Sequence, residues 1–308
     1  MVERRGMGYR LTPEVARALE RGDAVVALES SLIAHGFPRP DNLSVGRALE
    51  REVREAGAVP ATIAVLDGEV RVGLAADEIE RLATSDQVTK CSLRDLAPLC
   101  ASGGSGATTV AATLRIATQA GIAVFATGGI GGVHRRHGGP PDVSADLYAL
   151  AQAPLSVIST GAKSILDLPA TLECLETLGV PVIGYRCDEF PAFHSAASGL
   201  KLRHRVDEVD ELAAVARAKA GLGLGCALLV CNPPPPEAAL AGDEVERLVA
   251  AALAEARAEG IAGPELTPFL LAALDRLSGG RTRAVNRALA EANARLGAEL
   301  AVVLAKAG

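Results

Sequence analysis

Short apolar runs recur along the chain, and each is ended by a segment rich in glycine or polar residues. They predict buried strands at residues 24–28, 122–127, 155–160, 181–185 and 226–231. These runs are apolar at nearly every position, which is typical of strands covered on both faces in a parallel sheet. The runs 122–127 and 155–160 both end in Thr-Gly. We therefore expect loops at the carboxyl ends of a parallel sheet, where open α/β folds place their sites.

Helical patterns alternate with the strands and fill the end of the chain. Thr12 and Pro13 start a helix that ends near Gly22. Further helices are predicted at 42–56, 76–83, from after Lys163 to about 178, 207–220, 237–259, 265–277 and 281–297. The segment 32–42 is rich in glycine and proline, so we expect a loop there.

Asp67 and Gly68 stand between two alternating runs, a strong signal for a β-hairpin over residues 61–72. The predicted α/β sheet is therefore mixed, although mostly parallel. We expect one domain over residues 1–308, with a helical segment of about 237–308 packed on it. In the last helix, Asn286 is expected to face solvent.

The stretch 126–167 is the strongest candidate for a site. Its loop contains six glycines together with His134, Arg135, Arg136, His137, Asp142, Ser144 and Asp146. Bare backbone amides, bases and carboxylates in one loop suit an anionic substrate. Lys163 follows just past the strand 155–160, where a partly desolvated amine can attack carbonyls. The alternative is a surface lysine at a helix start, with its ammonium in water.

Three other features lie near predicted strand ends. Glu29 is either a rim or capping carboxylate or a proton donor with a raised pKa. Lys90, in a short strand over 87–92, either holds an anion or is a solvated edge charge. The turn 102–106 precedes an apolar helical run over 107–119 and suits phosphate in principle, or is a glycine turn without a ligand. It lacks the Gly-Lys-Ser/Thr of a P-loop, so we expect no nucleotide cofactor.

Composition narrows the class of protein. The formal net charge is −6 and no long Lys/Arg cluster occurs, which argues against polymeric nucleic acid as a partner. Six cysteines form no Cys-x-x-Cys pair, so free thiols in a reducing compartment are expected. The N-terminus has no apolar core typical of a signal peptide, and no apolar run reaches the length of a membrane span. We expect a cytoplasmic protein without membrane contact.

Seven motifs resemble, in this order, the signatures of the pseudouridine-5'-phosphate glycosidase family, also called pseudouridylate synthase or the indigoidine-synthase-A family. They are ALESSLIAHGFPRPDNL, TKCSLRDL, SGGSGATTVAATL, FATGGIGGVHR, DVSADL, ISTGAKSILDLPATLE and CNPPPP. The resemblance runs from about residue 12 to the C-terminus. It implies a three-layer α/β/α sandwich, a homotrimer and a divalent metal, typically Mn²⁺. The implied activity is a lyase reaction that reversibly cleaves the C-glycosidic bond of pseudouridine 5'-phosphate with water, giving uracil and ribose 5-phosphate.

The resemblance also implies residue roles. Lys163 resembles the lysine that forms a Schiff base with the ring-opened ribose, Glu29 resembles the proton donor, and Asp142 resembles the metal-binding carboxylate. Substrate-binding positions are implied at Lys90, Val110, Ser144, Ala145, Asp146, His134 and Asn286.

The implied roles agree with the chemistry of the bond. Because a carbon–carbon bond is broken, protonating a leaving oxygen or nitrogen cannot help, whereas an iminium of Lys163 at C1' lets the bond to uracil break while a carboxyl group protonates the uracil carbon. Two alternatives stay open. A Schiff-base phosphosugar aldolase would use the same lysine but usually forms a (β/α)8 barrel, which the hairpin and the helical tail disfavour. A non-catalytic sugar-phosphate-binding protein would need neither Lys163 nor Glu29.

Overall fold

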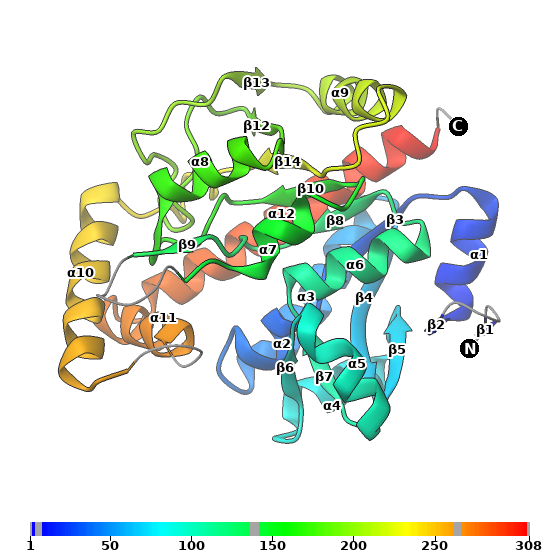
Figure 1. Cartoon of the computed structure of the whole chain (residues 1–308), viewed down its shortest axis with the longest axis horizontal. Helices are drawn as coiled ribbons and strands as arrows, with labels where there is room; N and C mark the ends of the chain where they lie inside the picture. The colour runs from blue at the N-terminus through cyan, green and yellow to red at the C-terminus, as the bar shows by residue number, and fades with distance from the viewer. Residues whose placement is uncertain (1, 4–7, 136–141, 262–265, 307–308) are drawn as a thin grey trace.

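The computed structural model describes residues 2–3, 8–135, 142–261 and 266–306. A 12-stranded sheet forms its centre, with helices on both faces (Figure 1). Six neighbouring strands run parallel, in the order β4 (Val59–Leu66), β3 (Val25–Glu29), β8 (Val124–Ala126), β10 (Ser156–Ser159), β14 (Leu228–Cys231) and β12 (Val182–Tyr185). The predicted strands therefore form one parallel array.

The outer strands make the sheet mixed, as expected. Beyond β12, β13 (His204–Val206) is parallel to it. Beyond β4 lie β5 (Glu69–Val72), β2 (Tyr9–Leu11) and β1 (Val2–Glu3), and a branch from β4 holds β7 (Gly106–Thr108) and β6 (Thr89–Cys91). The pairs β4–β5, β4–β7 and β1–β2 are antiparallel. A separate two-stranded sheet joins β9 (Val133–His134) to β11 (Leu166–Asp167).

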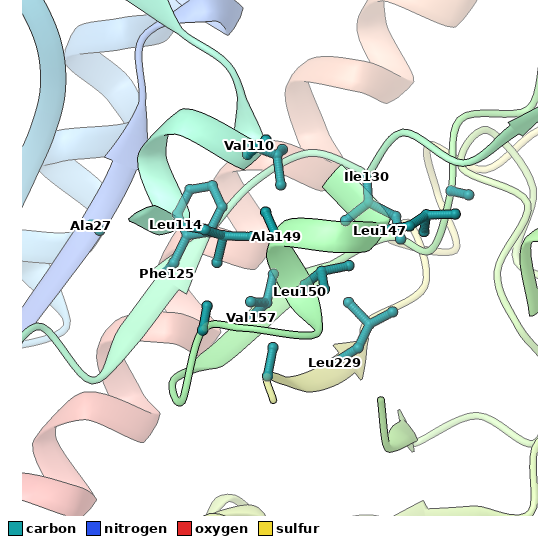
Figure 2. Close-up of a cluster of buried hydrophobic side chains, with 14 of the residues drawn as sticks. Ala27, Val110, Leu114, Phe125, Ile130, Leu147, Ala149, Leu150, Val157 and Leu229 are labelled. Atoms are coloured by element: carbon teal, nitrogen blue, oxygen red, sulfur yellow. The ribbon is translucent and has the colours of Figure 1, made fainter. Parts of the chain in front are cut away.

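Side chains alternate between two cores along each central strand. In β3, Val25 and Ala27 enter one cluster, whereas Val26 and Leu28 enter the other. Both faces must therefore be covered, which explains why the strand is apolar throughout. Figure 2 shows the first cluster, where Phe125 and Val157 of the sheet meet Leu114, Leu147 and Leu150 of the helices.

The helices form a layer on each face. The first layer holds α1 (Pro13–Arg21), α6 (Val110–Ala120), α7 (Ala145–Leu150), α8 (Leu168–Thr177), α10 (Gly242–Ala258) and α11 (Leu266–Leu277). The second layer holds α3 (Asp41–Glu55), α9 (Val209–Gly221) and α12 (Arg281–Ala305). Near the β6–β7 branch, α2 (Ser31–His35) and α4 (Ala76–Thr84) share a third cluster, and α5 (Leu93–Ser102) follows β6. The three-layer α/β/α fold with a helical C-terminal segment is thus confirmed.

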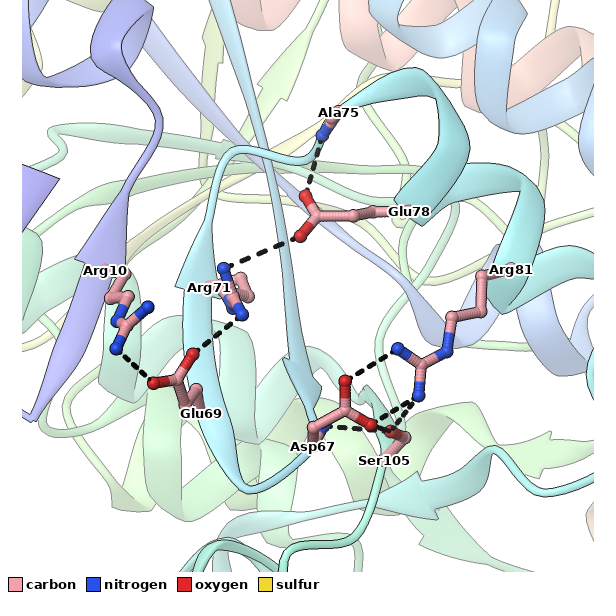
Figure 3. A network of polar contacts seen from close by, with 8 residues as sticks. All are labelled: Arg10, Asp67, Glu69, Arg71, Ala75, Glu78, Arg81 and Ser105. Atoms are coloured by element: carbon pink, nitrogen blue, oxygen red, sulfur yellow. Dashed lines mark hydrogen bonds and ion pairs between the residues drawn. The ribbon is translucent and has the colours of Figure 1, made fainter. Parts of the chain in front are cut away.

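The hairpin between β4 and β5 is the predicted one. Asp67 and Gly68 both have positive φ, at 52° and 77°, as a two-residue turn of type I′ requires. Arg81 of α4 donates to Asp67 at 2.7 Å, and a chain of ion pairs from Arg10 to Glu69, Arg71 and Glu78 borders the hairpin (Figure 3). These contacts join β2, β5 and α4 at the edge of the sheet.

Two segments differ from the predictions. Residues 31–35 form a short helix where a loop was expected, because Leu32 and Ile33 are buried and Ser30 O accepts from Ile33 N at 3.0 Å. The turn 102–106 does not lead directly into a helix, since β7 intervenes. A Cβ on Gly104 or Gly106 would lie 2.5 or 2.4 Å from Leu99 side-chain atoms, so close packing gives these glycines a structural reason.

The other predicted elements are present, although several end two or more residues away and the last helix extends eight residues further. The helices α5 and α7 and the strand β13 were not predicted. In the part of the chain that the structure describes, no helix is long and apolar enough to cross a membrane. The six cysteines are all free in the structure.

Candidate active site

The site lies where four neighbouring parallel strands end. Glu29 is the last residue of β3, Thr127 follows β8, Thr160 follows β10 and Asn232 follows β14. The ladder continues into these residues: Thr127 N donates to Ile158 O at 3.0 Å, and Asn232 N donates to Ser159 O at 2.9 Å. The expected loops at the carboxyl edge of the sheet are therefore present.

Glu29 is a buried carboxyl group with an exposed fraction of 8%. Its Oε1 accepts a hydrogen bond from Thr127 Oγ1, and its Oε2 accepts one from Ser31 Oγ. A cavity of about 10 Å³ beside it is lined mainly by apolar side chains, from Leu28, Leu32, Leu49, Ala126 and Ala290. Burial raises the pKa of Glu29, although the Lys163 ammonium and the two hydroxyls act in the opposite direction. Glu29 is thus buried and does not lie at a solvent-exposed rim.

Four charged side chains from distant parts of the sequence act on each other here. The charges of Lys163 and Asp146 both shift the pKa of Glu29. The charges of Lys163, Asp146 and Glu29 all shift the pKa of Lys90. The pKa of Lys90 is lowered, first by burial and next by the like charge of Lys163. Two cations and two carboxylates therefore share one electrostatic environment. Such a cluster at strand ends is typical of a functional site.

Asp146 links the glycine loop to the start of α6. Its Oδ1 accepts from Ala111 N at 2.9 Å, and its Oδ2 accepts from Gly131 N at 2.8 Å. Ser144 caps α7, and a Cβ on Gly131 would lie 2.2 Å from Ser144 Oγ. Only glycine fits this approach. Asp146, Ser144 and Val110, the first residue of α6, are thus brought together, whereas Ala145 is exposed.

Backbone hydrogen bonds join the loop that carries Lys163 to the glycine loop. Lys163 N donates to Ile130 O at 3.2 Å, and Ile130 N donates to Gly161 O at 3.0 Å. Next to the lysine, Ser164 Oγ lies 3.0 Å from His194 Nδ1. His194 is buried, which lowers its pKa to about 3 and keeps the ring neutral. Lys163 is therefore a half-buried amine on a constrained backbone.

His134 and Asp142 lie side by side at the outer part of the loop. His134 N donates to Asp142 O at 2.9 Å, and His134 Nε2 lies 3.9 Å from Asp142 Oδ2. Arg136 and His137, which the sequence also indicated, lie outside the described residues. Within those described, no group of three His, Cys, Asp or Glu side chains is arranged to hold a metal. Asp142 is exposed, so this region fits only a cation that keeps most of its water ligands.

Asn286 does not simply face solvent, which corrects the prediction. Its Oδ1 is buried without a hydrogen-bond partner among the described residues. The same atom lies 3.5 Å from the position of a Cβ on Gly128, so the amide reaches the carboxyl edge of the sheet. The helical pattern could not show this, because the position of α12 on the sheet sets which side of the helix meets the site.

Sequence reasoning missed four residues that contact the site. Thr127, Ser31 and His194 are described above; Asn293 of α12 is fully buried and donates to Thr127 O at 2.8 Å. The Thr-Gly strand end was the one signal for Thr127. His194 lies in an irregular segment and Asn293 in a helical pattern, and neither position carried a signal.

A cavity of about 470 Å³ lies elsewhere, between α1, α3 and the start of α4. Its guanidinium groups already have carboxylate partners. Arg54 pairs with Glu14 at 2.5 Å, and Arg47 pairs with Glu80 at 3.3 Å. None of the residues predicted to act on substrate lines it, so the strand ends are the better candidate site.

Comparison with known proteins identifies the family of this chain. Residues 14–303 match the family model described as indigoidine synthase A like protein. A pseudouridine-5'-phosphate glycosidase of Symbiobacterium thermophilum is 52% identical over 301 residues, which cover 96% of this chain and 97% of that protein. The prealnumycin C-glycosynthase AlnA, solved in complex with ribulose 5-phosphate, superposes with a TM-score of 0.90 at 41% identity, covering 97% of both chains.

A second solved structure is an indigoidine synthase A-like protein of Thermotoga maritima, with a TM-score of 0.88 at 35% identity over 99% of both chains. The agreement thus covers sequence, fold and nearly the full length. This chain belongs to the indigoidine synthase A-like family.

Proposed function

We propose that this protein is a pseudouridine-5'-phosphate glycosidase, which reversibly cleaves the C-glycosidic bond with water to give uracil and ribose 5-phosphate. The proposal rests on one observation: a buried carboxyl, Glu29, and an amine, Lys163, interact electrostatically at the carboxyl edge of the sheet. The name shared by relatives at about half identity supports the substrate, and the ribulose 5-phosphate bound by AlnA supports a phosphosugar.

In the proposed mechanism Lys163 acts as the nucleophile. Its nitrogen bonds to C1' of the ribose, and the ring opens as the ring oxygen leaves with a proton. The nitrogen lone pair then forms the iminium as the bond between C1' and uracil C5 breaks, and the electron pair goes to C5. Water finally hydrolyses the iminium, which releases ribose 5-phosphate and restores the amine.

Glu29 is the proposed proton donor to uracil C5. A donor must hold its proton near the working pH, and burial raises the pKa of this carboxyl in that direction. Thr127 and Ser31 orient its two oxygens. Burial against Leu28, Leu32 and Ala126 also keeps bulk water from taking the place of the acid.

The phosphosugar is proposed to bind between Lys90 and the start of α6. Lys90 supplies a cation, and the N-terminus of α6 at Val110 supplies the positive end of the helix dipole. Thr109 Oγ1, at the same helix start, is buried and unpaired among the described residues, so it can bond to substrate. The unpaired Oδ1 of Asn286 offers an acceptor for a hydroxyl or a base N–H.

We propose that Asp142 holds a hydrated Mn²⁺, with His134 beside it. When bound, the ion supplies ordered waters and positive charge near the substrate. Asp142→Ala should lower activity strongly at limiting Mn²⁺ and less at saturating Mn²⁺. Isothermal titration of Mn²⁺ should show weakened binding by the variant; a binding isotherm that matches the wild type would contradict the assignment.

Reduction with borohydride tests the function directly. During turnover with ribose 5-phosphate it should fix the sugar phosphate to Lys163, which peptide mapping locates in the segment 159–167. Lys163→Arg should form no adduct, because a guanidinium stays protonated and cannot form the imine. Glu29→Gln should still form the adduct but should release no uracil from pseudouridine 5'-phosphate.

Lys90→Arg is the matched control, since it alters the other site lysine. It should weaken binding yet still allow trapping at Lys163 at high substrate concentration. An adduct at Lys90, or full activity in Lys163→Arg, would contradict the proposal. Trapping without cleavage of pseudouridine 5'-phosphate would favour a phosphosugar aldolase, and neither trapping nor cleavage would favour a non-catalytic binding protein.

A further inference from the structure

One asparagine of α12 joins the ends of three strands of the site. Asn293 Nδ2 donates to Thr127 O at 2.8 Å and to Thr160 Oγ1 at 3.0 Å, with a longer contact to Gly128 O at 3.3 Å. Its Oδ1 accepts from Asn232 Nδ2 at 3.0 Å. The side chain is fully buried. A single amide therefore contacts the residues that follow β8, β10 and β14.

The close approach of α12 to the sheet makes these contacts possible. Figure 1 shows α12 running across the central strands. One turn after Asn293, a Cβ on Gly297 would lie 3.2 Å from Ala126 Cβ and 3.6 Å from a Val26 methyl. The backbone of α12 thus packs directly on small strand side chains there, which brings the short asparagine side chain within reach of the strand ends.

The residues bonded by Asn293 contact or adjoin both proposed catalytic residues. Thr127, whose carbonyl Asn293 holds, donates its hydroxyl to Glu29. Thr160, whose hydroxyl Asn293 holds, lies three residues before Lys163, and its N donates to Gly128 O at 2.9 Å. An amide is suited to this task because it has both a donor and an acceptor side. Leaving these buried carbonyls without a donor would cost free energy and let the two strand ends separate.

We propose that Asn293 is a positioning residue, which sets the distance between the acid Glu29 and the amine Lys163 by joining the ends of β8 and β10. This inference rests on the proposed function. Because proton donor and nucleophile must act on the two carbons of one bond, a small displacement between them slows the reaction without preventing binding.

The test compares Asn293→Ala and Asn293→Asp with the wild type, using pseudouridine 5'-phosphate as the substrate. We expect Asn293→Ala to lower kcat by about 10- to 100-fold while KM changes by less than about threefold. Asn293→Asp places an oxygen against two carbonyl oxygens, so its ionised form repels them. A protonated carboxyl can donate again, and kcat relative to wild type should rise as the pH is lowered.

Thr282→Val is the matched control. Thr282 is also buried in α12, and its hydroxyl lies 3.1 Å from Ser278 Oγ and forms no hydrogen bond to a strand end among the described residues. It should lower the Tm yet keep kcat. The inference is overturned if kcat of Asn293→Ala stays within about twofold of wild type, or if Asn293→Asp shows no gain in relative kcat at acidic pH. Should Asn293→Ala fail to fold, the pH dependence of Asn293→Asp carries the test alone.

Borohydride trapping separates this inference from the proposed function. If the wild type gives no adduct at Lys163 with ribose 5-phosphate, the proposed function fails. If the wild type is trapped and both Asn293 variants turn over at the wild-type rate at every pH, the positioning role alone is wrong.

Discussion

Among single residues, Glu29 shows how the environment decides the role of a carboxyl group. Its position after a buried strand left two roles open, because a strand-end carboxylate can also face water. In the structure, burial raises its pKa, whereas Lys163, Ser31 and Thr127 lower it. The net direction is upward from an ordinary value of 4.5. The proton is therefore kept to higher pH, as the proposed donor requires.

We predict that Thr127→Val extends activity to higher pH. The Thr127 hydroxyl stabilises the ionised form of Glu29, so its loss should raise the pKa of Glu29 further. The basic limb of the kcat profile should therefore move to higher pH. Thr177→Val removes an exposed hydroxyl of α8 and should leave the profile unchanged. A shift of the basic limb to lower pH would contradict this account of Glu29.

Among the elements, the loop that carries Lys163 depends on contacts from three other segments. Arg135 donates to Ser164 O and to Leu166 O, each at 3.2 Å, and pairs with Glu246 of α10 at 2.8 Å. His194 contacts the hydroxyl of Ser164. Arg135 thus connects α10 of the helical tail to the loop that carries the proposed nucleophile.

We predict that Arg135→Lys lowers kcat about tenfold, because one ammonium nitrogen cannot reach all the acceptors that Arg135 bonds through its three separate nitrogens. Steady-state kinetics with pseudouridine 5'-phosphate would measure the loss. Arg276→Lys is the control: Arg276 also pairs with a glutamate of α10, Glu255, but lies away from the Lys163 loop. Equal kcat values in the two variants would show that the contact serves only to attach α10.

At the scale of the whole molecule, the site gathers groups that are far apart in the sequence. Glu29, Lys90, Asp146 and Lys163 come from four separate segments, and Asn286 and Asn293 come from the C-terminal helix. Parallel strands make this gathering possible, since their carboxyl ends all meet at one edge. The helical tail therefore contributes to the site itself and does more than cover the sheet.

The resemblance to the family also leads us to expect a homotrimer. Tyr148 of α7 and the preceding Val143 are exposed large apolar side chains near the glycine loop, which subunit contacts would cover. Light scattering of the purified protein should give a mass three times that of the 31.5 kDa chain. A mass equal to one chain, independent of concentration, would contradict the expectation.

Much of the fold follows from local patterns. Continuous apolar runs predict buried strands, Asp67-Gly68 predicts the hairpin, and Thr12 with Pro13 predicts the first helix start, because these effects act within a few residues. The patterns failed where packing competed with local signals. Residues 31–35 form a helical turn because Leu32 is buried in the second core cluster and Ile33 in the third, and β7 is a strand because it pairs with β4 and β6.

The sequence by itself determined the parallel array of strands, the glycine loop and the family resemblance that indicated Lys163 and Glu29. Only the tertiary structure decided that Glu29 is buried, that Asn286 reaches the strand edge, and that Asn293 joins three strand ends. The reason is physical: burial, close approach and hydrogen bonding between distant segments depend on how α12 lies across the sheet, and no local pattern contains that arrangement.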